Sequence, residues 1–152
     1  MITFQEEPLV DCLEEMKPLL SEHWDEIALH KDKIKLNPDY DKYLLLDSLG
    51  MLHVVTARDG DLLVGYFISF LQPHMHYKDH TFAMNDILYI HPEYRKGSAG
   101  YKLFKYAEKS LKEIGVHVLM IHAKVKNDFK PLMDKLGFNR VEYNYSKYIG
   151  EE

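Results

Sequence analysis

Apolar residues recur every three or four positions in several segments, which is the spacing that predicts amphipathic helices. The clearest stripe is formed by Leu103, Phe104, Ala107 and Leu111. This spacing predicts helices over residues 8–20, 22–30, 40–46, 101–114 and 128–136. Pro18 lies inside the first of these segments, so we expect a kink or an early end there.

Other segments are short runs of bulky and β-branched residues, which predict strands. Two such runs, residues 52–58 and 62–71, are joined at Asp59 and Gly60, a strong signal for a hairpin turn. Residues 82–90 and 117–125 have the same character, and residues 1–7 alternate as an edge strand does. Strands that alternate with helices predict one α/β domain over residues 1–152.

Composition narrows the class of protein. The 152 residues are 46% hydrophobic and 28% charged, and the only cysteine, Cys12, excludes an internal disulfide. No apolar run approaches the ~20 residues of a membrane span, and the first residues do not resemble a signal peptide, so we expect a cytoplasmic protein. The net charge of −5 argues against nonspecific nucleic-acid binding.

The segment 82–115 combines a predicted strand, a turn and a predicted helix. The turn, residues 91–100, contains Arg95, Lys96, Gly97 and Gly100. A glycine-containing turn that leads into a helix exposes backbone N–H groups at the positive end of the helix dipole. The segment therefore predicts an anion site that suits phosphate groups.

The residues around this turn, LYIHPEYRKGSAG, resemble the acetyl-coenzyme-A-binding motif of the GNAT N-acetyltransferase family. Arg95 and Gly100 match the outer positions of the family's pattern, while Ser98 stands where the first small residue is usually Gly. We expect Gly97 to supply the backbone flexibility one position early. The resemblance spans residues 52–138, and the chain is also similar to small GNAT proteins carried by bacteriophages and prophages.

The resemblance implies a GNAT fold, with a mixed central sheet of about six or seven strands flanked by about four helices. Residues 140–149 would supply the closing strands. It also implies transfer of an acetyl group from acetyl-coenzyme A (acetyl-CoA) to a primary amine of a small molecule or a protein, by direct attack in a ternary complex. Neither a nucleic acid nor a membrane is expected as a partner, and a homodimer is compatible with the family.

In the family, the backbone of the central strand pairs with the pantetheine arm of the cofactor, and the turn holds its pyrophosphate on backbone amides. The Leu88 N–H is then the expected donor to the thioester oxygen. The cofactor-binding residues implied here are Leu88, Tyr89, Ile90, Arg95, Lys96, Gly97, Ser98, Ala99, Gly100, Tyr101 and Asn127.

Asp86 is the candidate general base, because it lies two residues before Leu88, where several GNAT enzymes have a Glu that takes a proton through water. Strand alternation places Asp86 on one face with Met84, Leu88 and Ile90 unless a bulge intervenes. A carboxylate among apolar side chains tends to have a raised pKa, which suits a base near neutral pH. The alternative is a structural Asp bonded to a backbone N–H or a histidine.

The general acid of the family is often a Tyr in the last helix, but Met133 stands at that position here and has no proton to donate. The candidates to replace it lie on the expected closing strands and are Tyr143, Tyr145 and Tyr148. A second alternative needs no acid, because a thiol with a pKa of about 8.5 is a tolerable leaving group.

Acceptor contacts are expected from two places. In the family, the connection between the first two helices lines the acceptor pocket, so Trp24 is a candidate; the alternative is that Trp24 anchors the core. His74 and His76, in the expected loop 72–77, are candidates for the pocket rim. With His80 they suggest a metal, but ligand spacing with carboxylates is lacking, so we expect no metal site.

Two other functions use the same fold. One is a coenzyme-A-binding or regulatory protein whose catalytic residues have decayed, as Met133 suggests. The other is an interaction protein that binds a host factor. Turnover separates the enzyme from both, and the sequence does not identify the acceptor or the length of the acyl chain.

Overall fold

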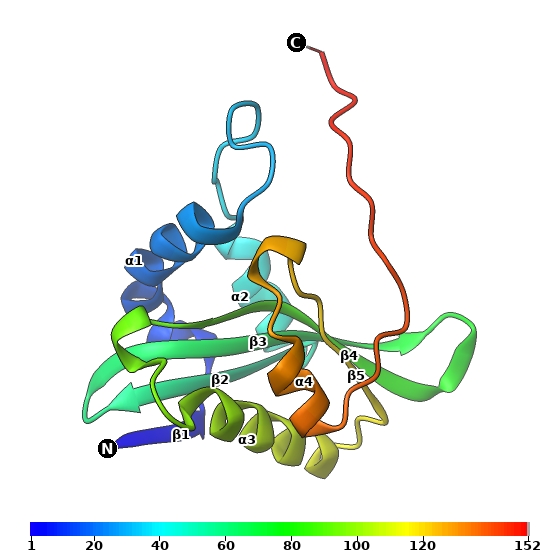
Figure 1. The fold of residues 1–152 in the computed structure, drawn as a ribbon. Coiled ribbons are helices and arrows are strands. Elements are labelled where there is room, and N and C mark those ends of the chain that lie inside the picture. Colours follow the sequence, from blue (N-terminus) through cyan, green and yellow to red (C-terminus); the bar gives the residue numbers. More distant parts are fainter. Residues whose placement is uncertain (152) are drawn as a thin grey trace.

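A computed structural model describes residues 1–151, in which five strands form one mixed sheet with helices on both faces (Figure 1). Neighbouring strands are antiparallel except the last two, β4 and β5, which are parallel. In their order across the sheet, the strands are β1 (Ile2–Glu6), β2 (Leu52–Asp59), β3 (Leu62–His74), β4 (Tyr77–Ile90) and β5 (Val118–Met120).

Two helices cover each face of the sheet. One face carries α1 (Leu9–Ile27) and α2 (Tyr40–Ser48), and the other carries α3 (Ala99–Glu113) and α4 (Lys130–Leu136). Two short 3-10 helices, Pro92–Tyr94 and Val125–Asn127, lie in the connections. No helix within residues 1–151 has the length and apolar character needed to cross a membrane.

Each face of the sheet has its own apolar core. The α1 stripe packs with Tyr66, Ile68 and Tyr89, and the α3 stripe packs with Val55 and Phe67. Neighbouring residues of β2 and β3 point to opposite faces, so both strands are buried over most of their length. The mixed α/β sheet and the four flanking helices predicted from the sequence are confirmed.

Helix α1 is continuous, so the predicted division into residues 8–20 and 22–30 is wrong. Pro18 lies inside α1, where it removes one backbone hydrogen bond. The buried stripe nevertheless continues past it from Met16 to Leu19 and His23. Packing on both sides of Pro18 therefore holds the helix together. The same stripe contains Cys12, whose thiol pKa is raised by burial to about 12, which fits a packing residue.

The expected sheet of six or seven strands is wrong, because residues 140–149 form no strand. A strand needs a neighbour for its backbone groups, and this segment runs away from the sheet without one (Figure 1). The strand predicted over residues 117–125 shortens to Val118–Met120, because the chain turns away from β4 after Met120. The expected loop 72–77 is instead mostly strand, since β3 and β4 extend almost to their turn.

Strands β3 and β4 approach very closely at Gly65. A Cβ atom placed on Gly65 would lie 2.7 Å from the Tyr89 carbonyl oxygen, which is a backbone atom and cannot rotate away. This contact lies directly before the turn that follows β4. The absence of a side chain at position 65 therefore allows β3 and β4 to pair this closely at the end of β4.

We predict that Gly65→Ala lowers the free energy of unfolding by about 2 kcal/mol, because the added methyl group must push two strands apart. Urea unfolding measures the change. Gly100→Ala is the matched control, since a Cβ there would make an ordinary 3.6 Å contact with Leu132. Equal unfolding midpoints for the two variants would show that a methyl group at position 65 does not lower the free energy of unfolding.

Candidate functional site

The site begins where β4 loses its neighbour. Strand β5 pairs with β4 only from Phe82 to Met84, and beyond this point β4 continues to Ile90 with one edge free. The Asn85 side chain sits at the divergence, where its Oδ1 accepts a hydrogen bond of 2.6 Å from the His122 N–H. This bond holds the end of β5 beside β4 while the backbones separate. The result is an opening between β4 and β5, the last two strands of the sheet.

The free edge of β4 presents backbone groups to this opening. The His91 N–H bonds to the Val64 carbonyl of β3 at 2.8 Å. Because N–H groups alternate between the two edges of an antiparallel strand, those of Ile90 and Leu88 point away from β3 and into the opening. The Leu88 N–H thus points in a direction that suits its predicted role as a donor to the thioester oxygen. The role itself stays a prediction.

A β-bulge places Asp86. The pairing of β3 with β4 shifts between Ile68 and Ser69, which leaves Asp86 as an extra residue of β4. The Asp86 carboxylate therefore turns toward α2, whereas Leu88 and Ile90 pack with the α3 cluster. The bulge is the exception on which the predicted face depended, so Asp86 does not share a face with Leu88 and Ile90.

Tyr43 is the partner of Asp86, and the sequence analysis did not identify it. Asp39 caps the start of α2 by accepting a hydrogen bond from the Lys42 N–H, and Tyr43 follows in the first turn. The Tyr43 hydroxyl donates a short hydrogen bond to Asp86 Oδ2. Burial raises the pKa of the Asp86 carboxyl, and the hydrogen bond from Tyr43 opposes that rise. Asp86 is thus a half-buried carboxyl that a neighbouring helix orients.

The turn after β4 leads into the first turn of α3, as predicted. Gly97 has a φ of +72°, so the expected backbone flexibility at this position is confirmed. Ser98 precedes α3 without a capping bond from its side chain. Within the described part of the chain, the N–H groups of Ala99, Gly100 and Tyr101 meet no acceptor, and the first turn of α3 holds no acidic residue. These groups and the helix dipole favour an anion.

Arg95 takes a different position from the one expected beside the anion site. Its guanidinium forms two hydrogen bonds with the Glu26 carboxylate of α1, at 2.8 and 2.7 Å, and its Nε donates to the Ile90 carbonyl at 2.7 Å. The pKa of Glu26 is lowered by this hydrogen bonding. Arg95 therefore ties the turn to α1, and its charge is already neutralised. Lys96 is exposed and has no ion pair among residues 1–151.

An aromatic cluster packs beside the ion pair of Arg95 and Glu26. His23 Nδ1 lies 3.0 Å from the Tyr66 hydroxyl, and the His23 ring stacks on Tyr89 with centroids 4.9 Å apart. The Arg95 guanidinium also lies over the Tyr89 ring, 5.2 Å from the ring centroid. Burial lowers the pKa of His23 to about 4, so this histidine is neutral near pH 7. The cluster is a structural support that the sequence analysis did not identify.

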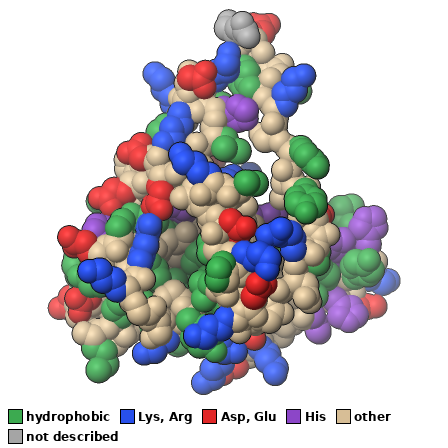
Figure 2. All heavy atoms as spheres, in the orientation of Figure 1, with side chains coloured by type: hydrophobic (Ala, Val, Ile, Leu, Met, Phe, Trp, Pro, Cys, Tyr) green, Lys and Arg blue, Asp and Glu red, His purple; other side chains and the backbone are tan. Residues whose placement is uncertain are grey.

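The three residues predicted to contact the acceptor lie on two separate parts of the fold. Trp24 is half-buried on α1 with Lys31 over its ring. His74 and His76 lie at the tip of the β3–β4 hairpin, well along β4 from Asp86, where Figure 2 shows histidines gathered on the surface. In the part of the chain described, no group of histidine, cysteine and carboxylate side chains could hold a metal ion.

The remaining predicted residues come after α3 in the sequence. Tyr143 and Tyr145 are 72% and 93% exposed on the unpaired C-terminal segment, so no strand brings them to the opening. Asn127 ends the short helix Val125–Asn127, and its Oδ1 is buried without a partner among the described residues. Met133 packs against the α3 cluster. A buried oxygen without a partner is costly, and a ligand would supply the missing donor.

Comparison with known proteins gives a family match. The model of the Acetyltransferase (GNAT) family matches residues 13–138. No curated protein matches the chain.

Solved structures share the fold over the whole chain. A ribosomal-protein-alanine N-acetyltransferase from Brucella melitensis is 19% identical with a TM-score of 0.72, and the match covers 99% of this chain and 100% of that one. A predicted acetyltransferase with acetyl-CoA from Clostridium acetobutylicum is 16% identical, with a TM-score of 0.70 and coverage of 97% and 96%. An aminoglycoside acetyltransferase from an uncultured soil sample, in complex with sisomicin, is 14% identical, with a TM-score of 0.73 and coverage of 97% of both chains.

We predict that Tyr43→Phe raises the pKa of Asp86, because the lost hydrogen bond had stabilised the charged carboxylate. Carboxyl-carbon NMR titration measures this pKa. Tyr40→Phe is the matched control, since Tyr40 lies on the same helix and its ring contacts Lys17. An Asp86 pKa that is unchanged in Tyr43→Phe would mean that the two side chains do not interact in solution.

Proposed function

Because the chain belongs to the GNAT acetyltransferase family, whose members use acetyl-CoA, we propose that it acetylates a primary amine by direct attack while both substrates are bound. One observation carries this proposal: the free edge of β4 is followed, after the turn of residues 91–98, by the unpaired N–H groups at the start of α3. The opening thus offers a long ligand first a row of backbone groups and then an anion site.

Acetyl-CoA fits the groups that the opening presents. The N–H groups of Leu88 and Ile90 suit the amides of the pantetheine arm, and those of residues 99–101 suit the diphosphate. The orphaned Oδ1 of Asn127 would accept a donor from the same arm. Since Arg95 is already paired with Glu26, Lys96 is the exposed cation that remains for the phosphates. When bound, acetyl-CoA supplies the acetyl group as a thioester.

Asp86 is proposed to accept the proton of the attacking amine, through water. An amine must be neutral to attack, so a base that works near neutral pH is useful. Burial raises the pKa of Asp86 toward that range, and Tyr43 fixes the direction of its carboxylate. The Leu88 N–H, on the same strand, would hold the carbonyl oxygen of the thioester.

The thiolate is proposed to leave without a protein acid. Met133 has no proton to donate, and the exposure of Tyr143 and Tyr145 does not favour contact with the opening. Burial and the hydrogen bond to Asp86 raise the pKa of Tyr43, which makes Tyr43 a poor proton donor as well. A thiol with a pKa of about 8.5 is a tolerable leaving group on its own.

The acceptor is proposed to be an amine of a small molecule or a protein. The similar structures include a ribosomal-protein-alanine N-acetyltransferase and an aminoglycoside acetyltransferase with sisomicin bound. The names of these two proteins cover a protein amine and a small-molecule amine on one fold. A panel of amines from both classes, screened by release of free thiol from acetyl-CoA, identifies the acceptor.

We predict that Asp86→Asn lowers turnover at pH 7 by roughly 100-fold or more, because the amide cannot accept the proton. The affinity for acetyl-CoA, measured by calorimetry, stays nearly unchanged, since Asp86 faces α2 and lies off the cofactor edge. Thiol release with the best amine of the panel measures the turnover.

Tyr143→Phe and Tyr145→Phe are the controls for this experiment, and both should retain turnover. An unchanged rate in Asp86→Asn would remove Asp86 from the chemistry. The unaltered protein could also bind acetyl-CoA tightly and release no thiol with any amine. That result would favour the alternative function, a coenzyme-A-binding protein whose catalytic residues have decayed.

We predict that Gly100→Pro abolishes acetyl-CoA binding without unfolding the protein. Proline removes one of the N–H groups of the anion site and adds bulk there, but it breaks no intrahelical bond because position 100 lies in the first turn of α3. Gly100→Ala keeps the N–H and is the control. Calorimetry with acetyl-CoA gives the affinity, and circular dichroism checks the fold; retained tight binding would place the diphosphate elsewhere.

A further inference from the structure

A small cavity lies on the face of β4 that carries Asp86. It has a volume of about 210 Å³ and is lined by Gln72, His74, Phe82, Met84, Met120 and Glu142. Two of the lining residues, Phe82 and Met84, precede Asp86 on β4 at intervals of two residues. Side chains two residues apart on a strand point to the same face, so these three side chains form one row.

The contacts of Tyr43 join the cavity to Asp86. The Tyr43 hydroxyl donates to Asp86, and the Tyr43 ring stacks on Phe70 of β3 with centroids 6.3 Å apart. Phe70 is in turn paired with Met84, which lines the cavity. At a rise of about 3.4 Å per residue, Met84 and Phe82 lie roughly 7 Å and about 13 Å along β4 from Asp86. A molecule whose amine reaches the proposed base can therefore extend its other end into the cavity.

The walls of the cavity suit a positively charged group. The rings of His74 and Phe82 are in contact, with centroids 4.7 Å apart, and aromatic ring faces attract ammonium groups. Met84 and Met120 add a polarizable apolar surface. The exposed Glu142 side chain also lines the cavity, and within the part of the chain that the structure describes no ion pair neutralises its carboxylate. The lining contains no lysine or arginine that would repel a cation.

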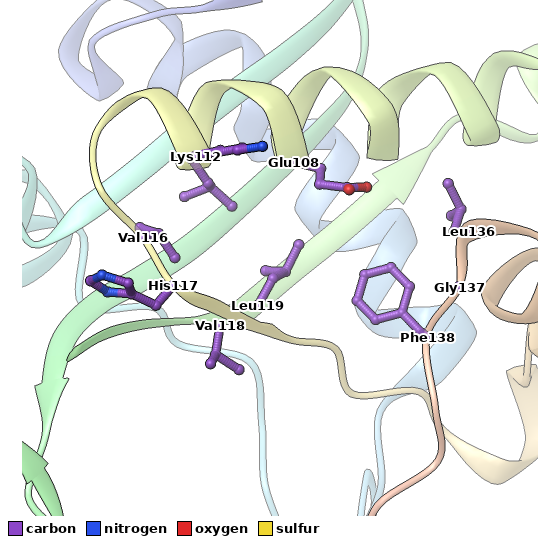
Figure 3. Close-up of a pocket in the computed structure, with 10 residues that line it drawn as sticks. Glu108, Lys112, Val116, His117, Val118, Leu119, Leu136, Gly137 and Phe138 are labelled. Carbon is purple, nitrogen blue, oxygen red and sulfur yellow. The ribbon is translucent and has the colours of Figure 1, made fainter.

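A larger groove, of about 340 Å³, lacks these properties. It lies between β5, the end of α3 and Phe138, as Figure 3 shows. Among the described residues that line it, none belongs to β4, so the groove does not adjoin the row that contains Asp86. Its carboxylate and its ammonium group, from Glu108 and Lys112, come from the same helix and have opposite charges. The smaller cavity is therefore the one that favours a cation close to the proposed base.

We propose that the acceptor carries a second ammonium group, about 10 Å from the amine that is acetylated, and that the small cavity holds this group. Glu142 pairs with its charge, and the rings of His74 and Phe82 contact its alkyl chain and its ammonium. The net charge of −5 favours the approach of such a cation. The inference rests on the proposed acetyl transfer and names its substrate class: a flexible amine with a second, protonated amine at its far end.

Binding of diaminooctane tests the cavity without any need for turnover. Octanediol is the matched neutral probe, because it has the same chain length and no charge. In NMR titrations at pH 7, the methyl signals of Met84 and Met120 should shift with diaminooctane. Its affinity should exceed that of octanediol by at least about fivefold, because only the diamine gains the ion pair and the contact with the rings.

Glu142→Gln should weaken the binding of diaminooctane by at least about fivefold and leave that of octanediol unchanged, because it removes only the charge. Phe82→Leu keeps an apolar side chain but removes the ring, and it should weaken diamine binding as well. Glu113→Gln is the matched control, since Glu113 is an exposed carboxylate at the end of α3, and this variant should bind as the unaltered protein does. Circular dichroism confirms that each variant is folded. Equal diamine affinity in Glu142→Gln and the unaltered protein would overturn the proposal.

Thiol release from acetyl-CoA then compares diaminooctane with aminooctanol, which has the reactive amine but no second charge. Diaminooctane should have the lower KM at a similar kcat, and Glu142→Gln should remove this difference. Alanyl-lysine against alanyl-norleucine repeats the comparison with peptides, and a preference in either pair shows which source supplies the second ammonium.

Equal kcat/KM within both pairs would overturn the proposal. A different result separates it from the proposed acetyl transfer. Diamine binding that depends on Glu142, with no thiol release from any amine, would reject the transfer and retain the cavity as a cation site.

Discussion

The site depends on the loss of pairing between β4 and β5 after Met84. A strand buried in a sheet normally has both edges satisfied, but β4 continues to Ile90 with one edge open. Asn85 accepts a hydrogen bond from the His122 N–H at the point of divergence, so the chain after β5 stays tied to β4 there. The open edge is therefore built into the fold, and it leaves backbone groups of β4 without a partner strand.

Two side-chain pairs fix the surroundings of this edge. Arg95 and Glu26 join the turn after β4 to α1, and Tyr43 and Asp86 join α2 to the bulge in β4. The first pair neutralises the charge that the sequence suggests for phosphate binding. The proposed anion site therefore relies mainly on the backbone N–H groups at the start of α3, whose direction is set by the helix. The second pair holds the half-buried carboxyl of Asp86 on the α2 face of β4.

Local signals were sufficient for the parts of the structure that depend on near neighbours. The α3 stripe, the hairpin at Asp59 and the left-handed Gly97 were all predictable, because spacing or backbone geometry determines them. Tyr43 with Asp86 and Arg95 with Glu26 are separated by 43 and 69 residues, and no local pattern links them. The prediction of closing strands was wrong for a related reason. The alternation of apolar and polar side chains shows that residues 140–149 can form a strand, but it does not show whether another strand lies beside them.

An amide NMR titration with acetyl-CoA tests the central claim most directly, because the proposed contacts are backbone groups. The amide signals of Leu88, Ile90 and residues 97–101 should shift together and saturate, with desulfo-coenzyme A producing the same pattern. Unchanged signals for these residues, with shifts elsewhere or none at all, would contradict the account and leave the opening beside β4 without its proposed ligand.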